Sequence, residues 1–194
     1  MSVIEIFGFP PSTYTQAARL ALAEKGVEHT LSRVDFGRPE HLAVHPFAKI
    51  PAMRRGNLTL FESSAIATYA DLEFEGPSLT PSDPVAAALM QQWVTAGVDY
   101  LYPAFVKPGL SKEPASEDDK LLRDRAGKAM DQALSKSDYL AGDMLSIADL
   151  EIVPMVNYFS RFDDGVEFLS QHPPVAAWLE RMRARPSFKA VIPE

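Results

Sequence analysis

The spacing of apolar residues changes once along the chain, and this change constrains the fold more than any other feature of the sequence. Up to about residue 76, short runs typical of buried strands alternate with helical spacing, whereas after residue 84 only helical spacing is found. Residues 77–84 lie between them and are rich in proline and serine, as linkers are. We therefore expect a first domain at 1–76, a linker at 77–84 and a second domain at 85–194.

The first domain shows a β-α-β pattern, then a proline-containing loop, then a β-β-α pattern. The first helix should end at Gly26, which suits a helix C-cap, and Gly56-Asn57 is a turn signal between two strands. This order is that of a thioredoxin-like fold, in which one parallel crossover precedes one hairpin. The expected elements are a strand at 3–7, a helix at 13–25, a strand at 28–34, a loop containing Pro39, Pro46 and Pro51, strands at 52–54 and 58–60, and a helix at 63–73.

The second domain shows stripes of apolar residues at helical spacing and no strand pattern, so we expect a helical bundle. Ser146 and Asp149 have the spacing of a capping box, which predicts that a helix begins there. The fold class is therefore α/β plus all-α. The stripes are Val85, Leu89, Trp93, Ala96 and Tyr100; Leu122, Ala126, Ala129 and Ala133; and Val175, Trp178 and Met182.

Composition excludes several classes of function. The chain has no cysteine, so any thiol chemistry requires a thiol that arrives as a ligand. A formal net charge of −7 disfavours nucleic acid as a partner. No apolar run approaches the roughly 20 residues of a membrane span, and the first residues do not resemble a signal peptide. We therefore expect a cytoplasmic protein that does not contact membranes. The four histidines show no metal spacing, and no metal is expected.

Several segments, taken in order, resemble the glutathione transferase superfamily over nearly the whole chain. The pattern is most similar to the phi, theta and zeta branches, which use a serine. The segments are Phe7–Ser12, Arg19–Gly26, Pro39–Leu42 with Pro46–Ala52, Leu60–Ile66, Tyr139–Asp143 with Ser146–Leu150, and His172–Val175 with Trp178 and Arg185-Pro186.

Ser12 is the residue that the resemblance assigns to catalysis. It stands where the first helix begins, and the partial positive charge of a helix N-terminus favours a thiolate. A hydroxyl that donates a hydrogen bond to that sulfur favours the charged form further, without being the nucleophile itself. Without the resemblance, Ser12 would be interpreted as an ordinary N-cap. Thr13 and Tyr14 are neighbouring hydroxyls that could take the role instead.

Lys49, Ile50 and Pro51 are expected to hold the middle and the glycine end of glutathione. In thioredoxin-like folds a cis-proline precedes the third strand and turns the backbone of the preceding residue towards a bound cysteinyl group. The resemblance implies this for Ile50-Pro51, and implies that Lys49 meets the glycine carboxylate. The alternatives are a trans turn proline and a solvated lysine.

Glu62 and Ser63 are expected to hold the γ-glutamyl end. Ser63 and the free N–H groups of a helix start suit its carboxylate, and Glu62 could accept a hydrogen bond from its ammonium group. Helix capping alone would explain the same residues equally well.

The sequence departs from the family pattern at Phe36-Gly37, where phi-like sequences often carry His-Lys. Both of those residues help hold the glycine end, so the departure bears on glutathione affinity more than on the fold. His41 and His45 lie nearby but out of register.

Two further interpretations concern the helical domain. Asp149 should be a structural capping residue and not a reacting carboxylate. The electrophilic substrate is expected to bind beside the long helix of this domain. Aromatic side chains that could line its site are Phe9, Tyr14, Tyr100, Phe105 and Tyr158, although aromatics at helical spacing are more often core.

The resemblance implies a glutathione transferase that uses glutathione as a cosubstrate, needs no other cofactor and forms a homodimer. It would attach the glutathione thiolate to a small apolar electrophile, as detoxifying transferases do. Two alternatives stay open. The same thiolate could serve a peroxidase or isomerase reaction, or the protein could be a binding or scaffold module without turnover.

Overall fold

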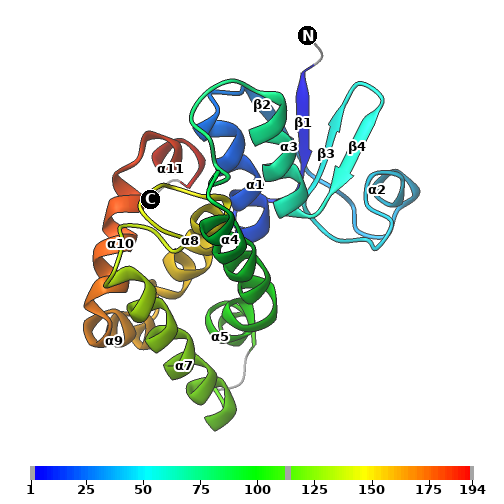
Figure 1. Ribbon diagram of the computed structural model, residues 1–194. Coiled ribbons are helices and arrows are strands. Elements are labelled where there is room, and N and C mark those ends of the chain that lie inside the picture. The colour runs from blue at the N-terminus through cyan, green and yellow to red at the C-terminus, as the bar shows by residue number, and fades with distance from the viewer. Residues whose placement is uncertain (1–2, 112–114, 193–194) are drawn as a thin grey trace. The chain divides into compact units, whose positions relative to one another are not determined.

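The structure is a computed structural model that describes residues 3–111 and 115–192 (Figure 1). The chain forms two compact units. The first comprises Met1–Leu79 together with Pro186–Glu194, and the second comprises Thr80–Arg185.

The first unit contains a four-stranded sheet in the order β2-β1-β3-β4. β1 pairs with β2 in parallel, while β3 pairs antiparallel with both β1 and β4. This is the predicted thioredoxin-like arrangement of one crossover followed by one hairpin. Its elements are β1 (Ile4–Phe7), α1 (Thr13–Glu24), β2 (His29–Ser32), α2 (Pro39–Val44), β3 (Ala52–Arg55), β4 (Leu58–Phe61), α3 (Ser63–Glu73) and α11 (Pro186–Val191).

Local sequence explains where α1 begins and ends. Ser12 caps its N-terminus, and Gly26 follows it in a left-handed conformation, with φ of 65°. Gly56 has φ of 60° in the turn between β3 and β4, which confirms the turn signal in the sequence. Pro39 stands at the start of α2, where its fixed φ suits a helix and its missing N–H costs nothing. The prolines of this stretch predict a loop, whereas the structure forms a short helix within it.

The last helix, α11, belongs to the first unit, which differs from the expected division that placed 85–194 together. α11 packs against α1, with Phe188 and Val191 buried. Ser187 donates a hydrogen bond from its hydroxyl to the Glu24 carboxylate at the end of α1. The first unit is therefore built from both ends of the chain.

The second unit is entirely helical in its described residues, as predicted. A continuous helical run from Pro84 to Phe105 includes one wider π turn at its middle. Its elements are α4 (Pro84–Ala96), η1 (Gly97–Leu101), α5 (Tyr102–Phe105), α6 (Lys107–Leu110), α7 (Glu117–Leu134), α8 (Ile147–Phe159), α9 (Asp163–Gln171) and α10 (Pro173–Ala184).

Asp149 lies at the centre of this unit, in the first turn of α8, and its side chain is fully buried. Four donors surround its carboxylate. The N–H of Leu140 and the indole N–H of Trp178 donate to Oδ1 at 3.0 and 2.9 Å, and the N–H and hydroxyl of Ser146 donate to Oδ2 at 3.0 and 2.9 Å. Burial raises the pKa of the Asp149 carboxyl, and these donors act in the opposite direction. The carboxylate thus ties α8 to α10 and to the 140 loop, which agrees with the structural interpretation.

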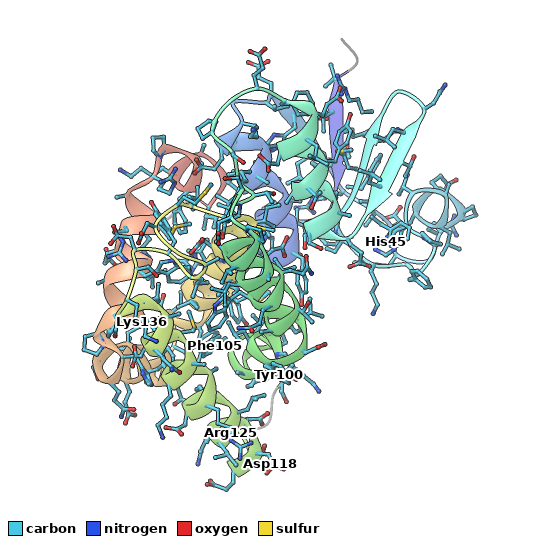
Figure 2. The ribbon with its side chains drawn as sticks, viewed as in Figure 1. His45, Tyr100, Phe105, Asp118, Arg125 and Lys136 are labelled. Carbon is cyan, nitrogen blue, oxygen red and sulfur yellow. The ribbon has the colours of Figure 1, made fainter. Side chains whose placement is uncertain are left out.

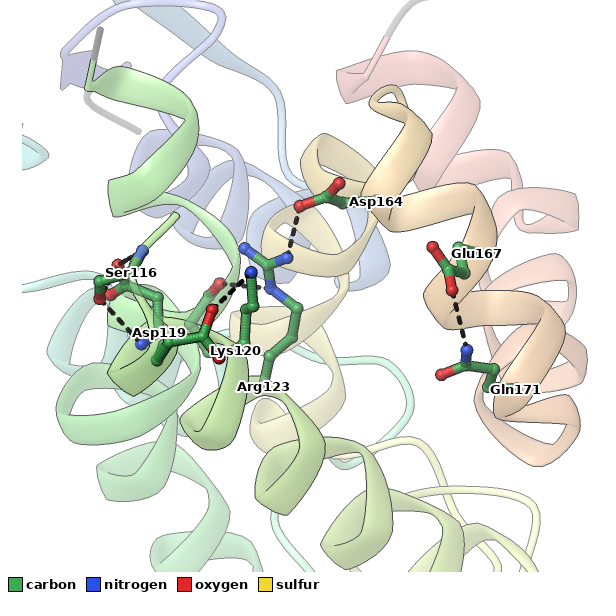
Figure 3. A network of polar contacts seen from close by, with 9 residues as sticks. Ser116, Asp119, Lys120, Arg123, Asp164, Glu167 and Gln171 are labelled. Carbon is green, nitrogen blue, oxygen red and sulfur yellow. Dashed lines mark hydrogen bonds and ion pairs between the residues drawn. The ribbon is translucent and has the colours of Figure 1, made fainter. Parts of the chain in front are cut away.

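A second capping box, Ser116 with Asp119, begins α7 at the surface (Figure 3). The N–H and hydroxyl of Ser116 donate to Asp119 Oδ2 at 2.9 and 2.7 Å. One turn later, Arg123 reaches Asp164 of α9 at 2.7 Å. The two boxes have the same sequence spacing but differ in burial.

Gly165 allows α9 to follow closely on α8. A Cβ atom at this position would lie 1.9 Å from the backbone oxygen of Phe159. We expect Gly165→Ala to lower the free energy of unfolding by about 3 kcal/mol, because a backbone atom cannot move aside as a side chain can. Chemical denaturation measures this change. Gly97→Ala is the matched control, since its Cβ would meet Ile152 at an ordinary 3.5 Å. Equal stability of the two variants would contradict the prediction.

Candidate functional site

The site is organised by three strand ends that lie side by side in the first unit. Phe7 at the end of β1 pairs with Ala52 at the start of β3, and Ala52 pairs with Phe61 at the end of β4. Neighbouring strands lie about 4.8 Å apart, so these three positions span about 10 Å. The loops attached to them therefore emerge at one end of the sheet.

All the residues predicted to activate or bind glutathione belong to these loops or begin the elements after them. The segment after β1 leads to α1, the segment before β3 includes the cis peptide bond Ile50-Pro51, and the segment after β4 leads directly to α3. The structure thus brings six predicted residues to the same end of the sheet. They are Ser12, Lys49, Ile50, Pro51, Glu62 and Ser63.

Ser12 combines capping with a free hydroxyl hydrogen. Its Oγ accepts a hydrogen bond from the N–H of Thr15 at 3.3 Å, which makes it the N-cap of α1. Accepting this bond leaves the O–H of Ser12 as a donor, and it has no acceptor among the described residues. The side chain is half-buried, whereas Thr13 is only 4% exposed. Capping and donation to a bound sulfur are therefore compatible roles for Ser12.

His41 positions the segment around Lys49, a role that the sequence analysis did not predict. The N–H of Gly37 donates to Nδ1 of His41 at 3.2 Å, and Nε2 lies 2.8 Å from the carbonyl oxygen of Lys49. Because Nδ1 accepts, the proton must reside on Nε2, which donates to Lys49. The imidazole thus joins α2 to the residues before Pro51. The signal was present in the Pro-Glu-His-Leu segment, but only as part of the family resemblance.

His45 is part of the core and cannot replace the missing cation at position 36 or 37. Its side chain is 1% exposed, and its ring lies 5.1 Å from that of Phe61. Burial lowers the pKa of His45, which keeps the ring neutral at neutral pH. Two exposed cations stand near the predicted glycine end, namely Arg38, which follows Gly37 directly, and Lys49.

Glu62 has an unusual backbone at the start of α3. Its φ of 70° and ψ of 126° lie in a region that residues other than glycine rarely occupy, at a cost of about 1–3 kcal/mol. Strain of this kind persists where the surrounding structure imposes it, often at ligand sites. The Glu62 side chain is exposed, and Ser63 after it is 6% exposed. This end of the sheet therefore presents an exposed carboxylate beside a helix N-terminus.

Phe36, where the sequence departs from the family pattern, contributes an aromatic wall. Its ring lies 5.5 Å from that of Phe9 and 5.2 Å from that of His41. Phe9 was predicted to line the electrophile site, and it stands in the loop that leads to Ser12. Where phi-like sequences often carry polar side chains, this chain therefore places an aromatic pair, Phe36 and Phe9, beside the loop that leads to Ser12.

The other predicted aromatic residues differ in their surroundings, and two of them, Tyr100 and Phe105, are labelled in Figure 2. Tyr14 lies in α1 and is half-buried, and Tyr100 in η1 is 55% exposed. Phe105 is 1% exposed and packs against Phe159 and Phe168, with ring centroids 5.3 and 5.1 Å away. Phe105 is therefore a core residue, which corrects the expectation that it lines a substrate site.

Tyr158 in α8 is partly exposed and packs edge-on against Phe162 at 5.2 Å. Burial raises the pKa of the Tyr158 hydroxyl, and Tyr102 raises it further. The phenol is consequently protonated at neutral pH.

An apolar groove of about 810 Å³ lies in the second unit, between α4 and α7. Leu89, Trp93 and Ala96 line it from α4, and Leu122 and Ala126 from α7. Tyr100, Arg125 and Lys136 stand along the same groove and are labelled in Figure 2.

Within residues 3–111 and 115–192, no group of three His, Asp or Glu side chains is arranged to hold a metal ion. Over the same residues, no helix has both the length and the apolar character that crossing a bilayer requires.

Comparison with known protein families matches both units. Residues 2–72 match the glutathione S-transferase N-terminal domain, and residues 96–186 match the glutathione S-transferase C-terminal domain. Glutathione S-transferase 1 of Triticum aestivum is 33% identical, with the match covering 98% of this chain and 94% of the relative. A probable glutathione S-transferase of Oryza sativa subsp. japonica is also 33% identical over 97% of this chain and 95% of the relative.

Solved structures give the same result. Glutathione transferase F7 from Populus trichocarpa superposes with a TM-score of 0.82 at 30% identity, covering 97% of each chain. A glutathione S-transferase-I bound with lactoylglutathione superposes with a TM-score of 0.85 at 26% identity, covering 98% of this chain and 99% of the other.

Proposed function

Because the chain belongs to the glutathione S-transferase superfamily, close to its plant phi branch, we propose that Ser12 activates glutathione at the sheet end described above. The protein is a glutathione transferase by its relationship to curated transferases over nearly its whole length. The observation that carries the proposal is the free O–H of Ser12 at the N-terminus of α1.

In this mechanism the glutathione sulfur lies at the start of α1. The helix N-terminus and the Ser12 O–H both favour the thiolate over the thiol. The thiolate attacks an electrophilic carbon, so that a sulfur–carbon bond forms while the electron pair of the broken bond leaves with the leaving group. Stabilisation of the thiolate and proximity supply the rate enhancement.

The ends of the tripeptide account for the remaining residues. Ser63 and the first N–H groups of α3 would bind the γ-glutamyl carboxylate, and the exposed Glu62 carboxylate would accept from the ammonium group. Lys49 would meet the glycine carboxylate, and the backbone of Ile50 would pair with the cysteinyl group. Glutathione is then a cosubstrate, and the apolar electrophile is the second substrate.

The experiment that tests this function is a pH titration of the glutathione thiolate absorbance with the protein in excess. We expect the thiol pKa of bound glutathione to fall below about 8.5, the ordinary value of a free thiol. Binding without a shift would favour the alternative of a non-catalytic binding module. Turnover of hydroperoxides, and not of alkylating substrates, would favour the peroxidase alternative.

Ser63→Ala should weaken glutathione binding by about 1–3 kcal/mol, because the ligand carboxylate loses a buried donor. Isothermal titration calorimetry measures this difference. Ser64→Ala is the matched control, since Ser64 is the next residue of the same helix and should leave the dissociation constant unchanged. An equal effect of the two variants would argue against the assignment of Ser63.

A homodimer is part of the same proposal, and the groove between α4 and α7 supports it. Leu89 and Tyr100, which line this groove, are 40% and 55% exposed on an apolar surface that a second copy would cover. Light scattering should therefore give twice the mass of 21.4 kDa. A monomer at micromolar concentration would contradict this part of the proposal. The cytoplasmic location stays a prediction from the sequence.

A further inference from the structure

A second cavity in the first unit lies at the opposite end of the sheet from Ser12. Its volume is about 760 Å³, and Ile4 and His29, which pair with each other at the starts of β1 and β2, both line it. Ile4 is three residues before Phe7, and a strand rises about 3.3 Å per residue, so about 10 Å of strand separates this cavity from the glutathione end. It is therefore a separate site.

Arg19 of α1 is held in this cavity by His29. Its Nε donates to Nε2 of His29 at 3.1 Å, and Nδ1 of His29 lies 3.1 Å from the carbonyl oxygen of Val27. Because Nε2 accepts, the ring proton resides on Nδ1 and is donated to Val27. Burial lowers the pKa of His29, and the Arg19 charge lowers it further, so the imidazole stays neutral. A neutral imidazole orients the guanidinium without neutralising it.

The Arg19 guanidinium has no counter-ion among the described residues. No Asp or Glu there lies within ion-pairing distance of it, and Nε is its one donor that has an acceptor among those residues. Lys25, which follows α1 directly, is buried, but it is paired with Asp71 at 3.2 Å. A partly buried cation without a partner favours an anion from solution. The two terminal nitrogens of a guanidinium match a ligand with two oxygens.

The other cation in the cavity is already satisfied. Arg55 donates to Glu73 and to the Tyr69 hydroxyl, each at 2.6 Å, and stacks over the Phe74 ring at 4.9 Å. Glu28 also lines the cavity and adds a negative charge. Because Glu28 repels a doubly charged phosphate more strongly than a singly charged anion, the cavity favours a single negative charge placed directly at Arg19.

Apolar side chains form much of the remaining wall. They come from β1, α1 and its C-terminal loop, the end of α3 and α11, and they would contact a hydrocarbon body next to the anionic group. They are Val3, Ile4, Ala23, Val27, Phe74, Ala190 and Val191.

We propose that this cavity binds a small organic monocarboxylate with an apolar body. The carboxylate pairs with the terminal nitrogens of Arg19, and the apolar body lies against Val27, Phe74 and Val191. The site depends on α11, because Ala190 and Val191 close one side of it.

The test is a titration of the isotopically labelled full chain with benzoate, followed by amide chemical shifts. Saturable shifts are expected at Ile4, Arg19 and Val191, and benzyl alcohol, the neutral analogue, should bind at least about tenfold more weakly. Arg19→Gln should weaken benzoate binding at least about tenfold, since a charge-assisted hydrogen bond is lost. Arg33→Gln, at an exposed arginine outside the cavity, should not.

Arg19→Lys, which keeps the charge without the forked geometry, should show intermediate affinity, and thermal unfolding of all three variants reports whether they fold. Unchanged benzoate affinity in a folded Arg19→Gln variant, equal affinity for benzyl alcohol, or tighter binding of inorganic phosphate would overturn the proposal. So would competition with saturating glutathione. Benzoate binding at Arg19 in a protein that fails to bind glutathione would support this site while contradicting the proposed function.

Discussion

Asp149→Ala should lower the free energy of unfolding by about 4 kcal/mol. Four donors lose their acceptor at once, and each buried donor left unsatisfied costs about 1–3 kcal/mol, part of which relaxation recovers. The change also removes the cap of α8 and the link from α8 to Trp178 of α10. Denaturation followed by tryptophan fluorescence reports it directly, because Trp178 is one of only two tryptophans.

Asp119→Ala is the matched control for this prediction. Asp119 makes the same contacts to Ser116 that Asp149 makes to Ser146, but its surroundings are open to water. The expected loss there is about 1 kcal/mol, typical of an exposed N-terminal cap. A similar loss in the two variants would mean that burial does not decide the effect. A folded Asp149→Ala protein with abolished turnover would instead indicate a reacting carboxylate.

Ser12→Ala should reduce kcat by about 10²-fold at neutral pH while leaving glutathione affinity nearly intact. The hydroxyl donates to the thiolate and not to the thiol, so its loss raises the pKa of the bound thiol. Removing one preorganised hydrogen-bond donor from an anion in an active site typically lowers kcat by about 10²–10³-fold. The deficit should shrink as the pH rises above the new thiol pKa, because the thiolate then forms without help.

Controls separate this role from helix capping. Ser12→Thr keeps both the cap and the O–H donor, and should retain most of the activity. Thr13→Val and Tyr14→Phe test the two neighbouring hydroxyls, and neither should shift the thiol pKa. Unchanged turnover in Ser12→Ala combined with a loss in Tyr14→Phe would transfer the activating role to Tyr14.

Much of the fold could be predicted from local signals. Gly26 and Gly56-Asn57 mark backbone conformations that few residues adopt, so they located the end of α1 and the turn of the hairpin. The helix at Pro39–Val44 was missed because proline both begins helices and interrupts them, and the sequence alone does not distinguish these uses. The assignment of α11 was missed because helical spacing reveals an apolar face but not the partner of that face.

In the candidate site, too, some features could be predicted from the sequence and others could not. Sequence resemblance indicated Ser12, Pro51 and Ser63, and the register of β1, β3 and β4 explains why positions so far apart in the chain meet. The contact from His41 to Lys49 depends on the orientation of one ring, which no sequence pattern encodes. The sequence could not show whether Phe105 lies in the core or lines a substrate site, because aromatic residues in both places have the same helical spacing.

The place of α11 in the first unit has a consequence for biosynthesis. The sheet and α1 are translated before the second unit, but the surface of α1 that α11 covers stays bare until the ribosome has made the whole second unit. Residues 80–185 then form one long loop whose ends must be brought together, although the entropic cost of closing such a loop grows only slowly with its length. The nascent first unit thus acquires α11, and with it one wall of the Arg19 cavity, only after the whole second unit has been translated.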